Sequence, residues 1–181
     1  MSLRNTVFAY GAVSKFFHWL IFFLVLFMLV FGFLLDDIPK DYQGAAYNLH
    51  KLIGLSILLL MVMRLIWTLI NPKPELSDVK PWERFVERLV HQLLYLAIIV
   101  MPLAGWIGAS SSGRGPHLGS LYLGLPIPKD KALITTCFQL HGIFAFVIIG
   151  LVTLHVLAAL YHHFIRKDDV LLRMMPKVSD R

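Results

Sequence analysis

Seven of the eight histidines in this chain lie in or at the ends of long apolar stretches, and only His117 lies well inside a polar one. An ionisable side chain in an apolar segment costs free energy unless it has a partner or a function. Imidazole in such a setting can bind a metal or a haem iron, or can carry a proton. One such histidine would be explained as a hydrogen-bonded structural residue, but seven together indicate that some of them are ligands: His18, His50, His91, His141, His155, His162 and His163.

The spacing of two of these histidines indicates what they bind. His141 and His155 are fourteen residues apart. On one α-helix this spacing gives about 21 Å of rise and only about 40° of rotation, so both side chains share one face at different depths. One helix can therefore supply one ligand to each of two stacked haems.

A second imidazole for each haem must come from a facing helix at the same depth. His50 and His141 begin two apolar segments at the same face, which predicts an outer pair. His18 lies near the inner end of the first segment, where the last segment offers both His155 and His162. Depth alone does not choose between these two partners for His18.

The elements that must position the histidines are four apolar segments. Hydrophobic residues make up 57% of the 181 residues and charged residues 15%, and the mean hydropathy is +0.70. A bilayer core of about 30 Å needs roughly 20 apolar residues in helical form. Four segments reach that length, 16–35, 49–70, 89–109 and 140–165. The fold class predicted is all-α, an integral membrane four-helix bundle with two b-type haems in its core, and residues 1–181 form its single domain.

Cysteine usage and charge exclude several other classes. The single cysteine, Cys137, leaves no internal disulfide, cysteine-rich zinc site, iron–sulfur cluster or covalent haem attachment, so any metal must sit on histidine. The net charge of +6 and the pI of about 9.6 do not indicate nucleic acid, because the basic residues flank the apolar segments.

The same basic residues predict the orientation. With both termini in the cytoplasm, the inner side holds Arg4, Lys15, Arg64, Lys73, Lys80, Arg84, Arg88, Arg166, Lys167, Arg173, Lys177 and Arg181. The outer side then holds only Lys40, Lys51, Arg114, Lys129 and Lys131. The excess of inner positive charge favours this orientation.

Three smaller features have two interpretations each. Gly54, Gly142 and Gly150 would let a flat macrocycle approach the backbone, but tight helix packing predicts the same glycines. Arg64 is a candidate partner for a haem propionate, or it extends to the membrane interface. The helical spacing of Glu83, Arg84, Glu87 and Arg88 favours a solvated helix face that extends the third segment into water, over a helix that lies at the membrane surface.

The order and spacing of these residues resemble the bacterial cytochrome b561 family of small dihaem membrane proteins over nearly the whole chain. The resemblance rests on Tyr10, His18-Trp19, His50, Gly54, Met61 to Leu65, His91, Tyr95, Pro102, Gly105, Gly113-Arg114, Gly124-Leu125, Pro128, His141, Gly150, His155, His162-His163, Lys167-Asp168 and Leu171 to Pro176. By this resemblance His155 rather than His162 pairs with His18, and His50 pairs with His141. His91, His162 and His163 match family positions too and are not assigned as iron ligands.

The best-characterised type in that family is a superoxide:ubiquinone oxidoreductase of the bacterial inner membrane. The resemblance implies a ubiquinone site near the inner haem, where His162, Ser14 and Lys15 are candidates to hydrogen-bond or protonate the quinone. On the outer face, a cationic patch of Lys51, Arg114, Lys129 and Lys131 would attract a small anion such as superoxide.

Two alternatives stay open at this point. A haem b subunit that passes electrons between quinone and a partner dehydrogenase or hydrogenase would have the same four-helix dihaem architecture. A haem-free channel, transporter or structural bundle would use the histidines as a proton path or for another metal. A reduced-minus-oxidised spectrum separates the haem proteins from the haem-free ones.

Overall fold

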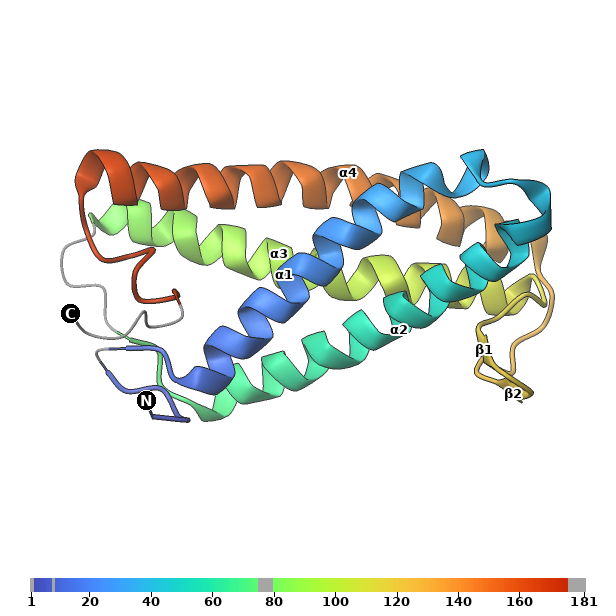
Figure 1. The fold of residues 1–181 in the computed structure, drawn as a ribbon, viewed down its shortest axis with the longest axis horizontal. Helices are drawn as coiled ribbons and strands as arrows, with labels where there is room; N and C mark the ends of the chain where they lie inside the picture. Colours follow the sequence, from blue (N-terminus) through green and yellow to red (C-terminus); the bar gives the residue numbers. More distant parts are fainter. Residues whose placement is uncertain (1, 8, 75–79, 176–181) are drawn as a thin grey trace.

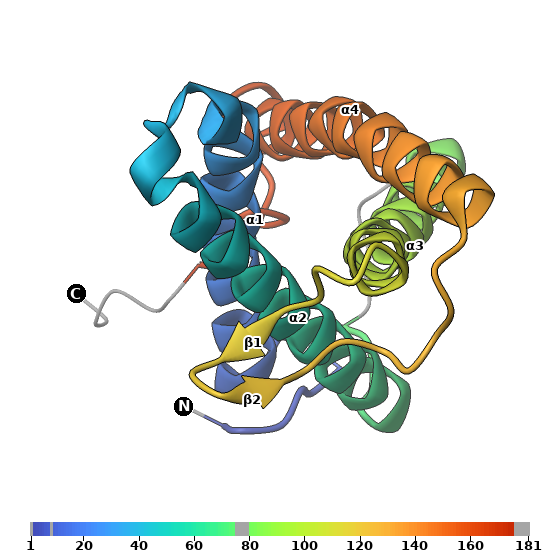
Figure 2. The same cartoon turned by 90° about the vertical axis from the view of Figure 1, so that its right-hand side faces the viewer.

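The computed structural model describes residues 2–7, 9–74 and 80–175. Four long helices dominate it, α1 (Ala12–Leu34), α2 (Lys40–Ile70), α3 (Pro81–Ser111) and α4 (Lys131–Tyr161). They run alternately in opposite directions around a common axis (Figures 1 and 2). Helix α1 packs on α2, α2 on α3, and α3 most extensively on α4. The predicted all-α four-helix bundle is confirmed. Pro176, Lys177 and Arg181, which entered the sequence argument, lie outside the described residues.

Each of the four helices is long and apolar enough to cross a membrane. The bundle has a narrow core in which Ile21, Met61 and Ile148 are almost fully buried. Many large apolar side chains remain outside it, for example Leu69 at 76% and Phe146 at 66% exposure. Apolar surface on this scale is rare on soluble monomers and is expected of side chains that face lipid.

Three helices begin eight or nine residues earlier than the apolar segments do, at Lys40, Pro81 and Lys131. For α3 and α4 the reason is capping. Pro81 occupies the first turn of α3, where a backbone N–H would have no partner within the helix, so its absence loses no hydrogen bond. Glu83 accepts a hydrogen bond from the Lys80 N–H at 3.0 Å. Asp130 caps α4 by accepting from the N–H groups of Ala132 and Leu133 at 2.8 and 3.1 Å. Hydropathy marks the part of a helix that meets lipid, so it misses these polar first turns.

The expectation that Glu83 belongs to a solvated helix face is wrong. Its side chain is buried, with 8% exposure for the residue, and Oε1 pairs with Nη1 of Arg166 at 3.1 Å. Periodicity places a residue on a helix face, but it does not show that the end of another helix, α4, covers that face.

The connections complete the two ends of the bundle. A 3-10 turn (Leu35–Asp37) links α1 to α2, and a short antiparallel hairpin, β1 (His117–Leu118) with β2 (Leu121–Tyr122), lies between α3 and α4. The hairpin is held to α2 by two reciprocal bonds, in which the Asn48 side chain donates to the His117 carbonyl at 2.8 Å and accepts from its N–H at 3.0 Å. Helix α4 ends in a π-helical turn, η2 (His162–Arg166), at the end of the bundle where α1 begins (Figure 1).

Candidate functional site

Two histidine pairs lie inside the bundle at two depths, as the spacing predicts. The outer pair is His50 on α2 and His141 on α4, with ring centres 6.0 Å apart. The inner pair is His18 on α1 and His155 on α4, with ring centres 6.1 Å apart. Two metal–imidazole bonds of about 2 Å each, added to the distance from each donor nitrogen to its ring centre, span about 6 Å. Both pairs are therefore spaced to hold one iron between them.

The outer pair faces a cavity of about 1190 Å³, which is large enough for a haem. Three observations fit a macrocycle there. The His141 Nδ1 lies 2.8 Å from the Met101 carbonyl, a bond that requires Nδ1–H and leaves Nε2 for a metal. The buried Nδ1 of His50 has no hydrogen-bond partner within the described chain. Gly54 and Gly142 line the cavity.

The cavity resolves the two interpretations of those glycines. A Cβ atom placed on Gly54 or Gly142 would have no described neighbour within 4 Å, so these residues do not mark a tight helix contact. The same is true of Gly150, which lines neither cavity described here. Two other glycines lie closest to the rings: Gly105, which belongs to the family pattern, and Gly32, which no sequence pattern indicated. A Cβ on Gly105 would lie 2.8 Å from the His141 Nδ1, and one on Gly32 would lie 3.2 Å from the His50 Cε1.

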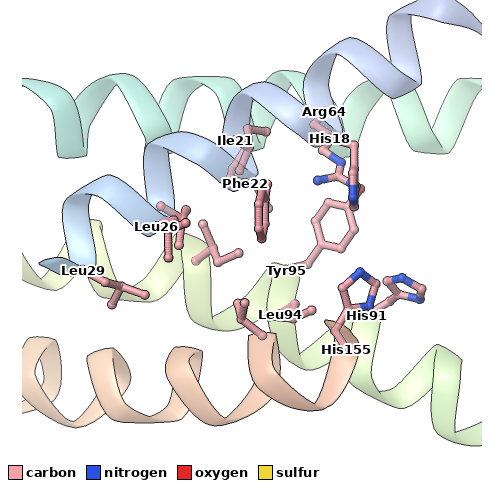
Figure 3. Close-up of a pocket in the computed structure, with 14 residues that line it drawn as sticks. His18, Ile21, Phe22, Leu26, Leu29, Arg64, His91, Leu94, Tyr95 and His155 are labelled. Atoms are coloured by element: carbon pink, nitrogen blue, oxygen red, sulfur yellow. The ribbon is translucent and has the colours of Figure 1, made fainter. Parts of the chain in front are cut away.

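The inner pair lines a smaller cavity of about 70 Å³ (Figure 3). His155 and His18 lie on opposite sides of it, whereas His162 is absent from its lining. His91 on α3 also lines it, with its ring centre 5.1 Å from that of His155 and its Nδ1 3.5 Å from Glu87. This separation is too short for an iron between the two rings, so the donor set fits the His18 and His155 pair.

Arg64 lies beside the inner pair. Its Nη2 is 3.1 Å from the His18 Nδ1, and its guanidinium carbon lies 5.4 Å from the ring centre of Tyr95. The Tyr95 hydroxyl is in turn 3.0 Å from the Thr68 hydroxyl. Figure 3 shows Arg64, His18 and Tyr95 grouped at one side of the cavity. The position allows the guanidinium to reach a carboxylate of a bound haem.

The predicted cationic patch is brought together only in part. Lys51 and Arg114 both line the outer cavity. The Lys51 ammonium donates to the Arg114 carbonyl at 2.6 Å, so this lysine also fixes the loop that covers the cavity. Lys129 lies against Gly113, because a Cβ on that glycine would be 3.0 Å from its Cε. Lys131 is exposed at the first residue of α4.

The three candidate quinone residues lie at the opposite end of the bundle, and each has a contact within the chain. The Ser14 hydroxyl donates to the Asn5 side chain at 2.7 Å and accepts from the Trp67 Nε1–H at 3.0 Å. The Lys15 ammonium donates to the Met175 carbonyl at 2.8 Å. His162 Nδ1 lies 2.6 Å from the Asp168 carboxylate, a contact that the sequence argument missed.

Comparison with known proteins finds relatives over nearly the whole chain. The family model described as prokaryotic cytochrome b561 matches residues 9–177. Cytochrome b561 homolog 2 of Escherichia coli (strain K12) is 33% identical over 99% of this chain and 97% of its own length. A protein of Yersinia pestis named probable superoxide oxidase CybB is 32% identical over 88% of this chain and 92% of its own length. Cytochrome b562 of Cereibacter sphaeroides is 28% identical over 87% of this chain and 89% of its own length.

Haem b is the cofactor of this family, and the two histidine pairs, the outer cavity and the ring-contacting glycines fit it. The haem-free channel or transporter is therefore the weaker interpretation. With a match that covers almost all of the chain, and with four apolar helices that each reach across a bilayer, the chain belongs to the prokaryotic cytochrome b561 family of multi-pass bacterial membrane cytochromes that transfer electrons.

Proposed function

We propose that the protein oxidises superoxide at the outer face of the bacterial inner membrane and reduces ubiquinone at the inner face. In balance, two superoxide ions, one ubiquinone and two protons give two oxygen molecules and one ubiquinol. The observation that carries the proposal is the presence of two histidine pairs, 6.0 and 6.1 Å between ring centres, at two depths of one bundle. The similarity to a protein named probable superoxide oxidase supports the choice of substrate.

In this proposal His50 and His141 hold the outer haem, and His18 and His155 hold the inner one. Two haems in these positions supply a path for single electrons between the faces. The Met101 carbonyl fixes the ring orientation of His141, at 2.8 Å from its Nδ1, and so keeps Nε2 directed at the metal position. Arg64 pairs with a carboxylate of the inner haem, because a guanidinium matches that group with two parallel hydrogen bonds.

The substrates are bound by residues at opposite ends of the bundle. Lys51, Arg114, Lys129 and Lys131 raise the local concentration of the superoxide anion at the mouth of the outer cavity. At the other end, Ser14, Lys15 and His162 bind and protonate ubiquinone. The excess of positive charge at that end supports an orientation with both termini in the cytoplasm, so that quinone takes up cytoplasmic protons.

The test is stopped-flow reduction of the purified, oxidised, haem-loaded protein by superoxide, with and without ubiquinone. We expect haem reduction faster than spontaneous dismutation of superoxide, and reoxidation when ubiquinone is present. If superoxide reduces the haems no faster than it dismutates, the superoxide assignment is wrong.

The second candidate is the haem b subunit of a partner dehydrogenase or hydrogenase. The hairpin favours it, because Leu118, Leu121 and Tyr122 are 63%, 58% and 51% exposed beside the outer cavity and offer an apolar contact surface. This candidate predicts slow reaction with free superoxide and a stable complex with a large enzyme after mild solubilisation. Replacing Leu118 and Leu121 with serine would then release the partner without loss of haem.

A further inference from the structure

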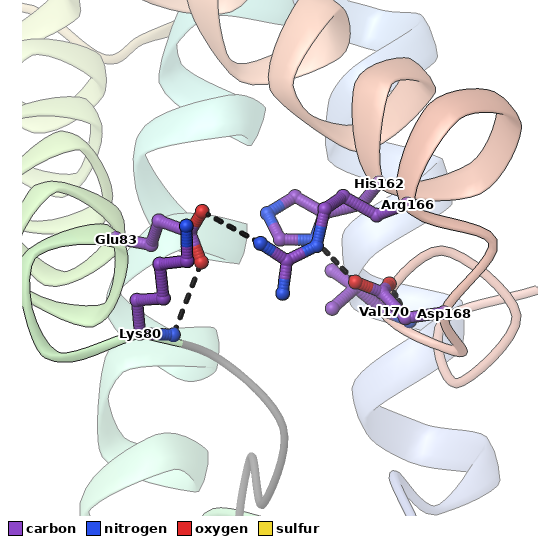
Figure 4. Close-up of polar contacts among 6 residues, drawn as sticks. All are labelled: Lys80, Glu83, His162, Arg166, Asp168 and Val170. Atoms are coloured by element: carbon purple, nitrogen blue, oxygen red, sulfur yellow. Dashed lines mark hydrogen bonds and ion pairs between the residues drawn. The ribbon is translucent and has the colours of Figure 1, made fainter.

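The chain reverses direction at the end of α4, so that Asp168, which follows the helix, contacts His162 in its last turn. The five residues of η2 are π-helical, and Lys167 then adopts the left-handed conformation, with φ of 57°. A left-handed residue reverses the chain at a helix end. The Asp168 N–H consequently donates to the His162 carbonyl at 3.2 Å, and the Asp168 carboxylate lies 2.6 Å from the His162 Nδ1 (Figure 4).

Other contacts hold this turn in place. The second carboxylate oxygen of Asp168 accepts from the Val170 N–H at 3.2 Å. Arg166 ties the turn to the start of α3 through the buried Glu83, at 3.1 Å, and Glu83 also accepts from the Lys80 N–H at 3.0 Å (Figure 4). Among the described residues, Asp168 therefore contacts His162 directly and Glu87 of α3 interacts with it electrostatically, while Arg166 of the same turn pairs with Glu83 of α3.

The chemistry of the pair follows from its donors and acceptors. Burial alone would raise the pKa of Asp168, but the hydrogen bond from His162, the Val170 N–H and the positive neighbours lower it below its ordinary value. An ionised carboxylate only accepts hydrogen bonds, so the proton in this contact belongs to Nδ1 of His162. The other ring nitrogen, Nε2, remains to exchange a proton, as in other sites where a carboxylate orients an imidazole.

We propose that Asp168 is a positioning residue that holds His162 in the orientation and charge state needed to protonate quinone at the inner face. The inference rests on the proposed reduction of ubiquinone there. The imidazolium gives its Nε2 proton to a quinone oxygen, where an O–H bond forms as the N–H bond breaks, and the electrons come from the reduced haems. Nε2 then regains a proton from water, and Asp168 stays ionised throughout.

The first test is the pH profile of reoxidation of the reduced, haem-loaded protein by a soluble ubiquinone. Asp168→Asn removes the ionised carboxylate that lies 2.6 Å from the His162 Nδ1, so the decline of the rate with rising pH should begin at a lower pH than in the wild type. A shift of one pH unit lowers the protonated fraction about tenfold at pH values above both midpoints. We therefore expect at least a tenfold lower maximal rate at pH 8, a KM for quinone changed less than twofold, and an unchanged rate at pH 5.

The matched controls are Asp169→Asn and His163→Gln, which change the neighbouring residues of the same types. Both should keep the wild-type profile. His162→Gln should keep both haems in the reduced-minus-oxidised spectrum and lose the pH-dependent part of the rate. A wild-type pH profile in Asp168→Asn, even with lowered thermal stability, would mean that the contact only caps the helix and would overturn the inference.

The second test needs no quinone turnover. Diethyl pyrocarbonate modifies neutral imidazole, and peptide mass spectrometry separates His162 from His163. At pH 6 the modification of His162 should be at least threefold faster in Asp168→Asn than in the wild type, while that of His163 stays the same. Equal rates at His162 would refute the pair. A wild-type protein that ubiquinone cannot reoxidise would refute the proposed function instead, whatever the modification shows.

Discussion

The guanidinium of Arg64 lies 3.1 Å from the Nδ1 of His18, measured from Nη2. A guanidinium has no acceptor, so in this contact it donates and the imidazole nitrogen accepts. A permanent positive charge therefore lies next to a proposed ligand of the inner haem. The outer pair differs, because the His141 Nδ1 contacts a neutral backbone carbonyl, that of Met101, at 2.8 Å. The two haem sites consequently have unequal electrostatic surroundings.

The first prediction follows from this inequality. A histidine that binds iron through Nε2 carries its proton on Nδ1, so in the haem-loaded protein the guanidinium would turn from His18 to a haem carboxylate. Its positive charge there disfavours the oxidised, more positive state of iron. Arg64→Gln should lower the midpoint potential of the inner haem by about 60 mV or more, the equivalent of a tenfold change in a one-electron equilibrium. A redox titration resolved into two components measures this. Arg64→Lys should retain most of the potential, and an equal shift of both haems in Arg64→Gln would contradict the assignment.

The second prediction concerns the ligands on α4. Because His141 and His155 share one helix face at two depths, His141→Ala and His155→Ala should each remove one haem and leave the other in place. Haem content per protein should fall from two to one in each variant, with a different component lost from the reduced-minus-oxidised spectrum. The ligand scheme fails if either variant retains both haems.

A third prediction uses the glycine that contacts the outer ligand. A Cβ on Gly105 would lie 2.8 Å from the Nδ1 of His141, which is closer than real Cβ contacts come, so Gly105→Ala must displace the ring from the Met101 carbonyl. We expect loss or weakening of the outer haem and little change in the inner one. Gly150→Ala is the matched control, because nothing described lies within 4 Å of its Cβ position and alanine favours a helix. Normal haem content in Gly105→Ala would show that the ring has room to move.

The fourth prediction concerns orientation. The end of the bundle where α1 begins and α4 ends carries most of the lysines and arginines, so the C-terminus should face the cytoplasm. A C-terminal alkaline phosphatase fusion should be inactive, and a fusion after Ser120 in the hairpin should be active in the periplasm. Strong phosphatase activity from the C-terminal fusion would reverse the assignment of outer and inner haems.

The sequence alone predicts the helices and places His141 and His155 on one face at two depths, because apolar length sets depth and helical rotation sets the face. That these histidines bind iron stays a prediction. Depth along the helices could not show whether His155 or His162 is the partner of His18. That choice depends on where α4 leaves its regular path, and η2 directs His162 to Asp168 instead of the inner cavity. Contacts between distant segments, such as Gly105 with His141 or Asn48 with His117, have no periodic signal and appear only in the folded chain.

The last prediction separates two roles of the cationic patch, the attraction of superoxide and the support of the loop over the outer cavity. Attraction between superoxide and exposed charges must weaken as salt shortens the Debye length from about 10 Å at 0.1 M to about 3 Å at 1 M. Superoxide-driven haem reduction should therefore slow with ionic strength in the wild type. Lys129→Gln and Lys131→Gln together should flatten that dependence and keep both haems.

Lys51 should behave differently from these two residues, because its ammonium also donates to the Arg114 carbonyl at 2.6 Å and so holds the loop over the outer cavity. Lys51→Gln should flatten the salt dependence and also weaken retention of the outer haem, measured as a faster loss of haem to apomyoglobin. Stopped-flow rates from 0.05 to about 1 M salt, the range over which screening becomes strong, provide the comparison. A rate that does not change with salt in the wild type would show that superoxide reaches the haem without help from these charges, and the patch would then have a structural role only.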